Sequence, residues 1–217
     1  MKQSTPSSHK EYTLGEEIAN SITHGVGLAL SIAGLVVLVT LSAIHGDVWR
    51  VVSFSLYGFT LILLYLNSTL YHAITNKKAK KVFRILDHAS IFLLIAGTYI
   101  PILLVTIRGV WGWTLFGIIW GLAILGVVFK SLFIHRFARL SVGLYVLMGW
   151  ICVIAMHEIF KKMDFGGIVL IASGGLFYTL GLVFYAWKKL PYNHMIWHLF
   201  VLGGSICHYF AFLLYVL

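Results

Sequence analysis

Seven apolar stretches, each about the length of a membrane-spanning helix, constrain the fold of this chain more than any other feature. A hydrocarbon core about 30 Å thick is crossed by about 20 predominantly apolar residues of helix. We expect spans over residues 22–44, 51–73, 84–106, 111–129, 140–157, 167–187 and 194–217. These runs do not alternate between polar and apolar residues, as the strands of a transmembrane β-barrel would. The sequence therefore predicts an all-α integral membrane protein, a bundle of seven transmembrane helices.

Composition excludes the soluble classes of protein. The chain is 60% apolar and only 11% charged, whereas soluble domains are about 45–50% apolar and about 25% charged. Residues 22–217 are predicted to form a single membrane domain, preceded by a polar cytoplasmic segment over 1–21. That segment contains acidic residues and leads into an apolar run too long for a cleavable signal peptide.

The distribution of Lys and Arg predicts the orientation of the bundle. The N-terminus and the connections between spans 2 and 3, 4 and 5, and 6 and 7 hold 12 of these residues, and the opposite side holds 4. By the positive-inside rule, the N-terminus is cytoplasmic and the C-terminus is outside. The net charge of +9 is then explained by topology and by contact with anionic lipid heads. We expect membrane lipids as partners and no nucleic acid.

Five polar residues within the spans converge at one depth. Ser68 and His72 are four residues apart at the cytoplasmic end of span 2, so they share one helical face. Asp87 lies near the start of span 3, and His194 and His198 lie one turn apart at the start of span 7. Ionisable groups inside a membrane are costly and usually face the bundle interior. These side chains are therefore the candidate functional site.

Three histidines from two helices have the ligand pattern of a catalytic zinc ion. His194 and His198 can grip one metal, and His72 completes a set that leaves a fourth tetrahedral position for water. Zinc lowers the pKa of such a water to about 7. Asp87 is then a candidate general base or an orienting partner of a ligand, and Ser68 a candidate donor to an oxyanion.

Each of these residues also has a purely structural interpretation. Histidines in membrane helices often only hydrogen-bond to neighbouring helices. Asp87 could pair with Arg84 at the interface, and Ser68 could hydrogen-bond to the backbone of its own helix.

A second polar group, Glu17, Asn20 and His24, precedes or opens span 1 with helical spacing. These residues could line one face at the cytoplasmic mouth, with His24 hydrogen-bonding to the site without touching the metal. Alternatively, they mark the start of a helix, with the acidic residue near its N-terminus and Asn20 or Ser21 as the cap.

The remaining histidines and the two cysteines are not predicted to join the site. His88 follows Asp87 directly and points about 100° away from it on a helix. His208 lies more than two turns beyond His198 and is expected to pack. His135 falls in a connection and is interpreted as an interface residue. Cys152 and Cys207 both lie inside spans, where a disulfide is not expected.

Four motifs in this order resemble the bacterial haemolysin III proteins, which belong with the progestin and adipoQ receptors. The segment 17–25, EIANSITHG, is similar to the opening signature of that family. The segment 67–72, NSTLYH, resembles its serine-to-histidine motif in span 2. The segments 86–88, LDH, and 194–198, HMIWH, resemble its motifs in spans 3 and 7.

The resemblance implies one zinc ion near the cytoplasmic face, with His72, His194 and His198 as ligands. It further implies that Asp87 contacts the bound water and that Ser68 lies beside it. The wider superfamily includes alkaline ceramidases, which hydrolyse lipid amides. We therefore expect a zinc hydrolase of a lipid amide or ester in the bacterial plasma membrane, acting in membrane-lipid homeostasis. The alternative is a non-enzymatic protein, either a haemolysin-like channel former or a lipid-sensing, receptor-like bundle with structural zinc.

Overall fold

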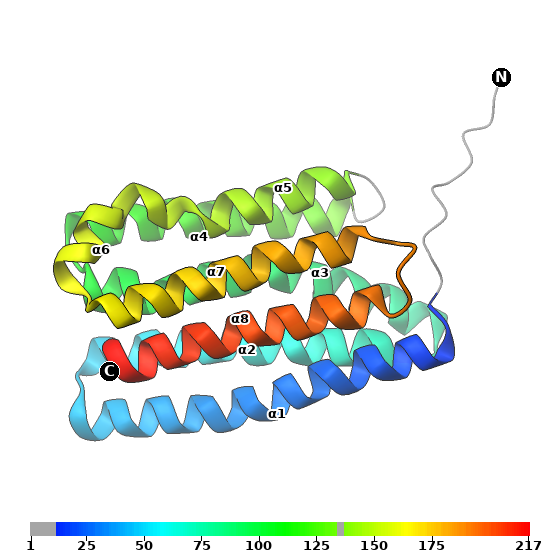
Figure 1. Cartoon of the computed structure of the whole chain (residues 1–217), viewed down its shortest axis with the longest axis horizontal. Coiled ribbons are helices and arrows are strands. Elements are labelled where there is room, and N and C mark those ends of the chain that lie inside the picture. Colours follow the sequence, from blue (N-terminus) through cyan, green and yellow to red (C-terminus); the bar gives the residue numbers. More distant parts are fainter. Residues whose placement is uncertain (1–11, 134–136) are drawn as a thin grey trace.

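A computed structural model describes residues 12–133 and 137–217, and these residues are helical with no strand among them. Figure 1 shows the helices running side by side along the long axis. Their bounds are α1 Leu14–His45, α2 Val48–Ala73, α3 Lys77–Pro101, η1 Ile102–Thr106, α4 Val110–Leu132, α5 Ala138–Gly149, η2 Ile151–Ala155, α6 Met156–Lys162, α7 Phe165–Ala186 and α8 Asn193–Tyr215. Seven segments are long and apolar enough to cross a membrane, with the fifth formed by α5, η2 and α6. The predicted fold class is confirmed.

The first helix begins eight residues before the predicted span. Thr13 is its N-cap: the Thr13 hydroxyl accepts a hydrogen bond from the Glu16 backbone N–H, and the Glu16 side chain accepts one from the Thr13 N–H. This reciprocal capping box satisfies two backbone donors. The prediction that Asn20 or Ser21 caps this helix is therefore wrong. Glu17, Asn20 and His24 therefore lie within α1, and their side chains contact histidines of α2 and α8.

Two further spans depart from uniform α-helix. The third begins at Lys77, where Asn76 accepts hydrogen bonds from two backbone N–H groups, and it ends in the π-helical η1 after Pro101. The helix therefore starts before the predicted span. Its first turn is rich in lysine, and hydropathy alone assigns such a polar stretch to a connection. The fifth span is interrupted by the 3₁₀ segment η2. Such irregular turns occur where the regular backbone hydrogen-bond ladder is locally changed.

The helices form a ring in which most neighbours in sequence are neighbours in space. Packing links α1 to α2, α2 to α3, α3 to α4 and α7 to α8, and α8 closes the ring on α1. Between α5 and α7, the Trp150 indole N–H donates to the Thr179 hydroxyl at 3.1 Å. In Figure 1, α1 begins at the same end of the bundle as the α2–α3, α4–α5 and α7–α8 connections. This end is called the N-terminal end below.

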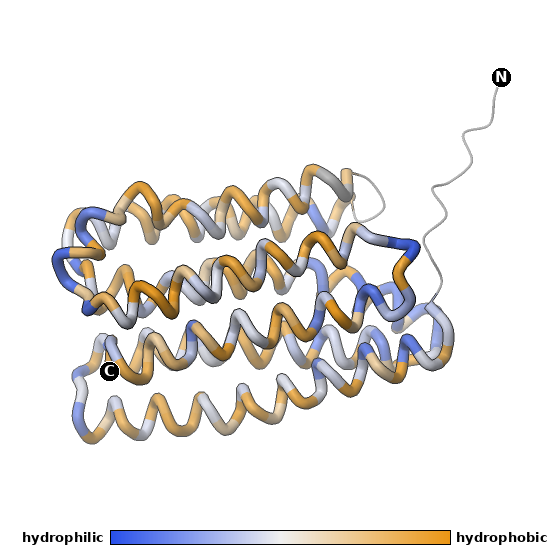
Figure 2. The backbone as a smooth tube through the Cα atoms, in the orientation of Figure 1, coloured by the Kyte–Doolittle hydropathy of each residue, from blue (hydrophilic) through white to orange (hydrophobic). Residues whose placement is uncertain are grey.

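Polarity is distributed as expected for a protein in lipid. Large apolar side chains point outward, for example Leu125 and Ile154, which are 67% and 66% exposed. Polar side chains point inward, for example Asn20 and Ser68, which are both 0% exposed. Figure 2 shows hydrophilic residues at both ends and, within the bundle, mainly toward the N-terminal end. Since lipid cannot hydrogen-bond to polar groups, the protein interior must satisfy them.

Glycines bring α7 and α8 into close contact, because small residues let neighbouring helices approach closely in lipid. A Cβ atom at Gly174 would lie 2.3 Å from the His208 ring, and one at Gly181 would lie 2.7 Å from the Cβ of Phe200. Neither position can accept a side chain unless its neighbour moves.

Substitution of Gly174 by Ala should destabilise the bundle by about 1–3 kcal/mol, because the added methyl group overpacks the α7–α8 contact. The matched control is Gly175→Ala, whose Cβ would lie 3.8 Å from Trp150, an ordinary contact distance. Thermal unfolding of both variants in detergent checks this. Equal unfolding temperatures would contradict the inferred packing.

The orientation remains a prediction, and fusions at the C-terminus test it. If the lysine-rich N-terminal end is cytoplasmic, a C-terminal alkaline phosphatase is exported and active, while a C-terminal green fluorescent protein is dark. The opposite pair of signals would place the histidine site at the outer face.

Candidate metal centre

Three buried histidines converge near the N-terminal end of the bundle. His72 lies in the last turn of α2, and His194 and His198 lie in the first two turns of α8. One ring nitrogen from each of the three lies within 4.8 Å of the others. The structure thus brings together the three residues that spacing alone selected as ligands.

The free nitrogens of this cluster favour a metal ion. Nε2 of His72 and both ring nitrogens of His194 are buried without a hydrogen-bond partner in the described part of the chain. Leaving a buried polar atom unpaired costs about 1–3 kcal/mol. Hydrogen bonding between helices therefore does not account for these three nitrogens. A tetrahedral ion would bind one nitrogen from each histidine, including Nε2 of His72 and one of the two unpaired nitrogens of His194, and leave one position open, so the residues fit a zinc ion.

Helix α1 orients two of the three rings from behind. Nδ1 of His72 lies 2.6 Å from Oε2 of Glu17 and 3.4 Å from the Asn20 side-chain amide. Nδ1 of His198 lies 3.2 Å from the Asn20 carbonyl oxygen and 3.3 Å from the Thr23 hydroxyl. A proton on each Nδ1 that is donated to these oxygens leaves the Nε2 lone pair for a metal, as in many metal sites.

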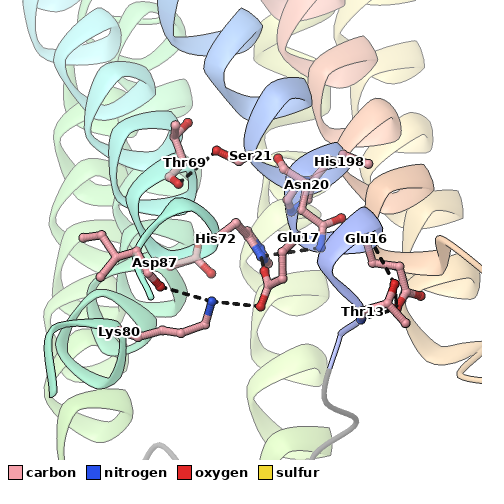
Figure 3. A network of polar contacts seen from close by, with 12 residues as sticks. Thr13, Glu16, Glu17, Asn20, Ser21, Thr69, His72, Lys80, Asp87 and His198 are labelled. Atoms are coloured by element: carbon pink, nitrogen blue, oxygen red, sulfur yellow. Dashed lines mark hydrogen bonds and ion pairs between the residues drawn. The ribbon is translucent and has the colours of Figure 1, made fainter. Parts of the chain in front are cut away.

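The Glu17 carboxylate is itself held in place. Its Oε1 forms an ion pair with Nζ of Lys80 at 2.8 Å, and its Oε2 contacts Nδ1 of His72. Figure 3 shows this row of Lys80, Glu17 and His72, which belong to α3, α1 and α2. The row joins three helices at the edge of the cluster.

Asp87 and Ser68 lie beside the histidines, as their depth in the spans predicts. Both are buried, and Asp87 is close enough to His72 and Ser68 to interact with both. Figure 3 shows Asp87 on α3, next to His72. Ser90 donates its hydroxyl to the Leu86 carbonyl at 2.6 Å, whereas the Ser68 hydroxyl makes no such bond to its own helix. The structural interpretation of Ser68 as a backbone-bonded serine is therefore wrong.

His24 meets the cluster by stacking. Its ring lies parallel to that of His198, with centroids 3.5 Å apart, and its two nitrogens have no hydrogen-bond partner within the described ranges. The expected hydrogen bond from His24 to the site is therefore not formed, because its ring lies face to face with the ring of His198. It limits the orientations that His198 can adopt.

Two other histidines stay outside the cluster. Nδ1 of His88 lies 2.8 Å from the Arg84 carbonyl oxygen. Nδ1 of His208 lies 2.8 Å from the Gly204 carbonyl oxygen, deeper in the bundle. His135 lies outside the described residues, and Cys152 and Cys207 are free thiols.

Tyr12, which no sequence motif indicates, covers the cluster from the N-terminal end. Its ring centroid lies 5.1 Å from that of His194 and 5.8 Å from that of His72. Burial raises the pKa of Tyr12 above its ordinary value, so the phenol is neutral at physiological pH. Only its position directly before the Thr13 cap could have indicated this role.

A cavity of about 180 Å³ extends from the cluster into the bundle. At the N-terminal end it is lined by Asp87 and His194, and its wall continues between α3, α5, α7 and α8 to Ile102 and Ile168. Most of its lining is aliphatic or aromatic. The histidine site therefore opens onto a space suited to a hydrocarbon chain.

Comparisons with known proteins agree on one family. The model of the family described as "Haemolysin-III related" matches residues 12–209. Hemolysin-3 of Bacillus cereus is 50% identical over 93% of this chain and 92% of its own length, and the Hemolysin-3 homolog of Bacillus subtilis is 48% identical over 94% and 96%. The human Monocyte to macrophage differentiation factor is 30% identical over 92% of this chain and 84% of its own length. No solved structure matches.

Removal of Glu17 should weaken metal binding while leaving the ligands in place. Because carboxylates that orient a ligand histidine typically contribute about 10–100-fold to affinity, we expect a loss of that size in Glu17→Gln. His72→Ala should abolish stoichiometric binding. Elemental analysis and zinc titration measure both effects, with His45→Ala at the far end of α1 as the control. A wild-type protein purified without metal, and unable to bind it, would contradict the site.

Proposed function

The chain belongs to the haemolysin III family and is a multi-pass protein of a bacterial cell membrane, and we propose that it is a zinc-dependent hydrolase of a lipid amide or ester. One observation carries the proposal. Three buried histidines, of which His72 and His194 have nitrogens without a hydrogen-bond partner, adjoin a buried carboxylate, Asp87, at the mouth of an apolar cavity. This combination matches a three-ligand catalytic site better than a closed structural one.

A zinc ion bound by His72, His194 and His198 would supply a Lewis acid and an acidified water. The side chains around it have separate roles in the proposed reaction. Asp87 takes a proton from the attacking water and returns it to the leaving amine or alcohol. Ser68, whose hydroxyl is free of the backbone, donates a hydrogen bond to the oxygen of the scissile carbonyl as negative charge develops. Glu17 holds His72 in position.

The cavity suggests the substrate class. An acyl chain fits against Ile91, Ile95 and Ile171, which line the space beyond Asp87. The scissile carbonyl would then lie at the polar end of the cavity, where the histidines meet. Burying a chain of this kind contributes about 0.8 kcal/mol per CH₂ group, so membrane lipids are suitable partners. We infer a role in membrane-lipid homeostasis.

Cytolysis is the second candidate function, since the Bacillus cereus relative is named Hemolysin-3. A channel former needs a continuous polar path across the membrane. The mainly apolar lining of the cavity favours a ligand site over such a path. Ion conductance in liposomes containing the purified protein would support the channel, and intact ion gradients would argue against it.

Release of fatty acid from N-acyl and O-acyl lipids by the purified protein tests hydrolysis. We expect Asp87→Asn to lose at least about 100-fold in rate, because it removes the general base, while retaining zinc. His194→Ala should lose both rate and zinc, and the control Glu158→Gln, at the opposite end, should lose neither. Zinc binding without turnover on any lipid of the panel would instead assign the ion a structural role.

A further inference from the structure

Lys130 is a buried cation that the proposed reaction does not use. It lies near the end of α4, is 3% exposed, and donates from Nζ to the Ser141 hydroxyl at 3.2 Å. An ammonium group inside a membrane protein is costly unless a negative charge compensates it. Lysines near helix ends usually extend toward water instead, so the inward position requires an explanation.

The described residues provide no negative partner for this charge. None of their carboxylates lies within 4 Å of Lys130, and the ion pairs present engage other groups. Glu17 is held by His72 and Lys80. Three other acidic residues lie at the opposite end of the bundle (Figure 1), namely Asp47, Glu158 and Asp164. Arg84 adds positive charge near Lys130, and the carboxylate that lines the same cavity, Asp87, lies 3.5 Å from Nδ1 of His88 and forms no ion pair with the lysine.

Lys130 and Ser141 line the same cavity as Asp87 and His194. The ammonium group therefore belongs to the wall of the ligand space, on the side formed by α4 and α5, whereas the histidines come from α2 and α8. A molecule in the cavity can meet both groups. A negative charge on that molecule would compensate the lysine and accept hydrogen bonds from Nζ. Ser141 accepts only one of the three N–H groups of the ammonium and donates its own hydroxyl hydrogen to the Phe137 carbonyl oxygen at 3.3 Å, so it holds the lysine in place.

We propose that Lys130 and Ser141 form a subsite for the phosphate of a lipid head group whose acyl chain occupies the cavity. The proposal deepens the proposed function, since it makes the substrate an anionic phospholipid. Binding at the subsite requires neither metal nor turnover. Phosphate fits because its oxygens accept several hydrogen bonds from one ammonium group, and because it is the common anion of membrane lipids.

Binding of monohexadecyl phosphate to the protein in non-ionic detergent tests the subsite. Trp150 and Trp197 line the cavity, so intrinsic fluorescence reports occupancy, and a chelator removes any contribution from metal. We expect Lys130→Met to bind this lipid at least about tenfold more weakly, the loss expected for one charge-assisted hydrogen bond. Lys130→Arg should retain most of the affinity. Hexadecanol, which has the same chain without charge, should bind the wild type and Lys130→Met equally.

The stability of the empty protein separates a binding role from a structural one. Burying an unpaired charge costs free energy, and replacing it by an apolar side chain of similar size removes that cost. Lys130→Met should therefore unfold at the wild-type temperature or above it. The matched control Lys78→Met, at an exposed position in the first turn of α3, should alter neither stability nor binding.

Three results would overturn the proposal. Equal affinity of the wild type and Lys130→Met for monohexadecyl phosphate would show that the lysine does not bind the anion. A marked loss of stability in empty Lys130→Met would show that Lys130 holds the fold. Displacement of the lipid by an equal concentration of inorganic phosphate would show that the site takes a soluble anion. Failure of lipid hydrolysis would affect none of these measurements, so the two proposals can fail separately.

Discussion

The hydrogen bond between Glu17 and His72 is the contact on which the arrangement of the site depends. The 2.6 Å separation connects α1 to α2, and the ion pair from Lys80 to the same carboxylate extends the connection to α3. Since Glu17 accepts a hydrogen bond from Nδ1–H of His72, Nε2 on the opposite side of the ring faces the other two histidines without a hydrogen-bond partner. One carboxylate thus sets the spacing of three helices and the tautomer of a ligand.

Placement in lipid explains why so many polar groups lie together at this end. A polar side chain in a membrane helix has no water to bond with, so it must find a partner inside the bundle. The Asn20 amide and carbonyl and the Thr23 hydroxyl meet ring nitrogens of His72 and His198. Among the described residues, the buried polar groups that keep no partner, above all the nitrogens of His194, are therefore the ones that a bound ion or ligand could satisfy.

Sequence alone was enough to predict the seven helices and the depth at which His72, His194 and His198 meet. Hydropathy limits the spans, and residues four apart share a helical face, so three short segments had to converge. The prediction missed Tyr12 because it precedes the apolar run, and it counted Lys130 only as a marker of orientation. Whether a lysine near a helix end faces water or a cavity depends on how α4 meets α5. Periodicity within one helix does not contain that information.

The histidine cluster joins α2 to α8, the second and the last of the membrane-spanning segments. A bound ion would therefore close a loop that contains more than half of the chain, including α3 to α7. During synthesis, His72 enters the membrane long before His194 and His198 exist. The complete set of ligands forms only after every other helix has been inserted and α8 has packed against α1. Loading of a metal ion would thus be tied to completion of the bundle, and a chain that stops before its last helix would carry only one of the three histidines.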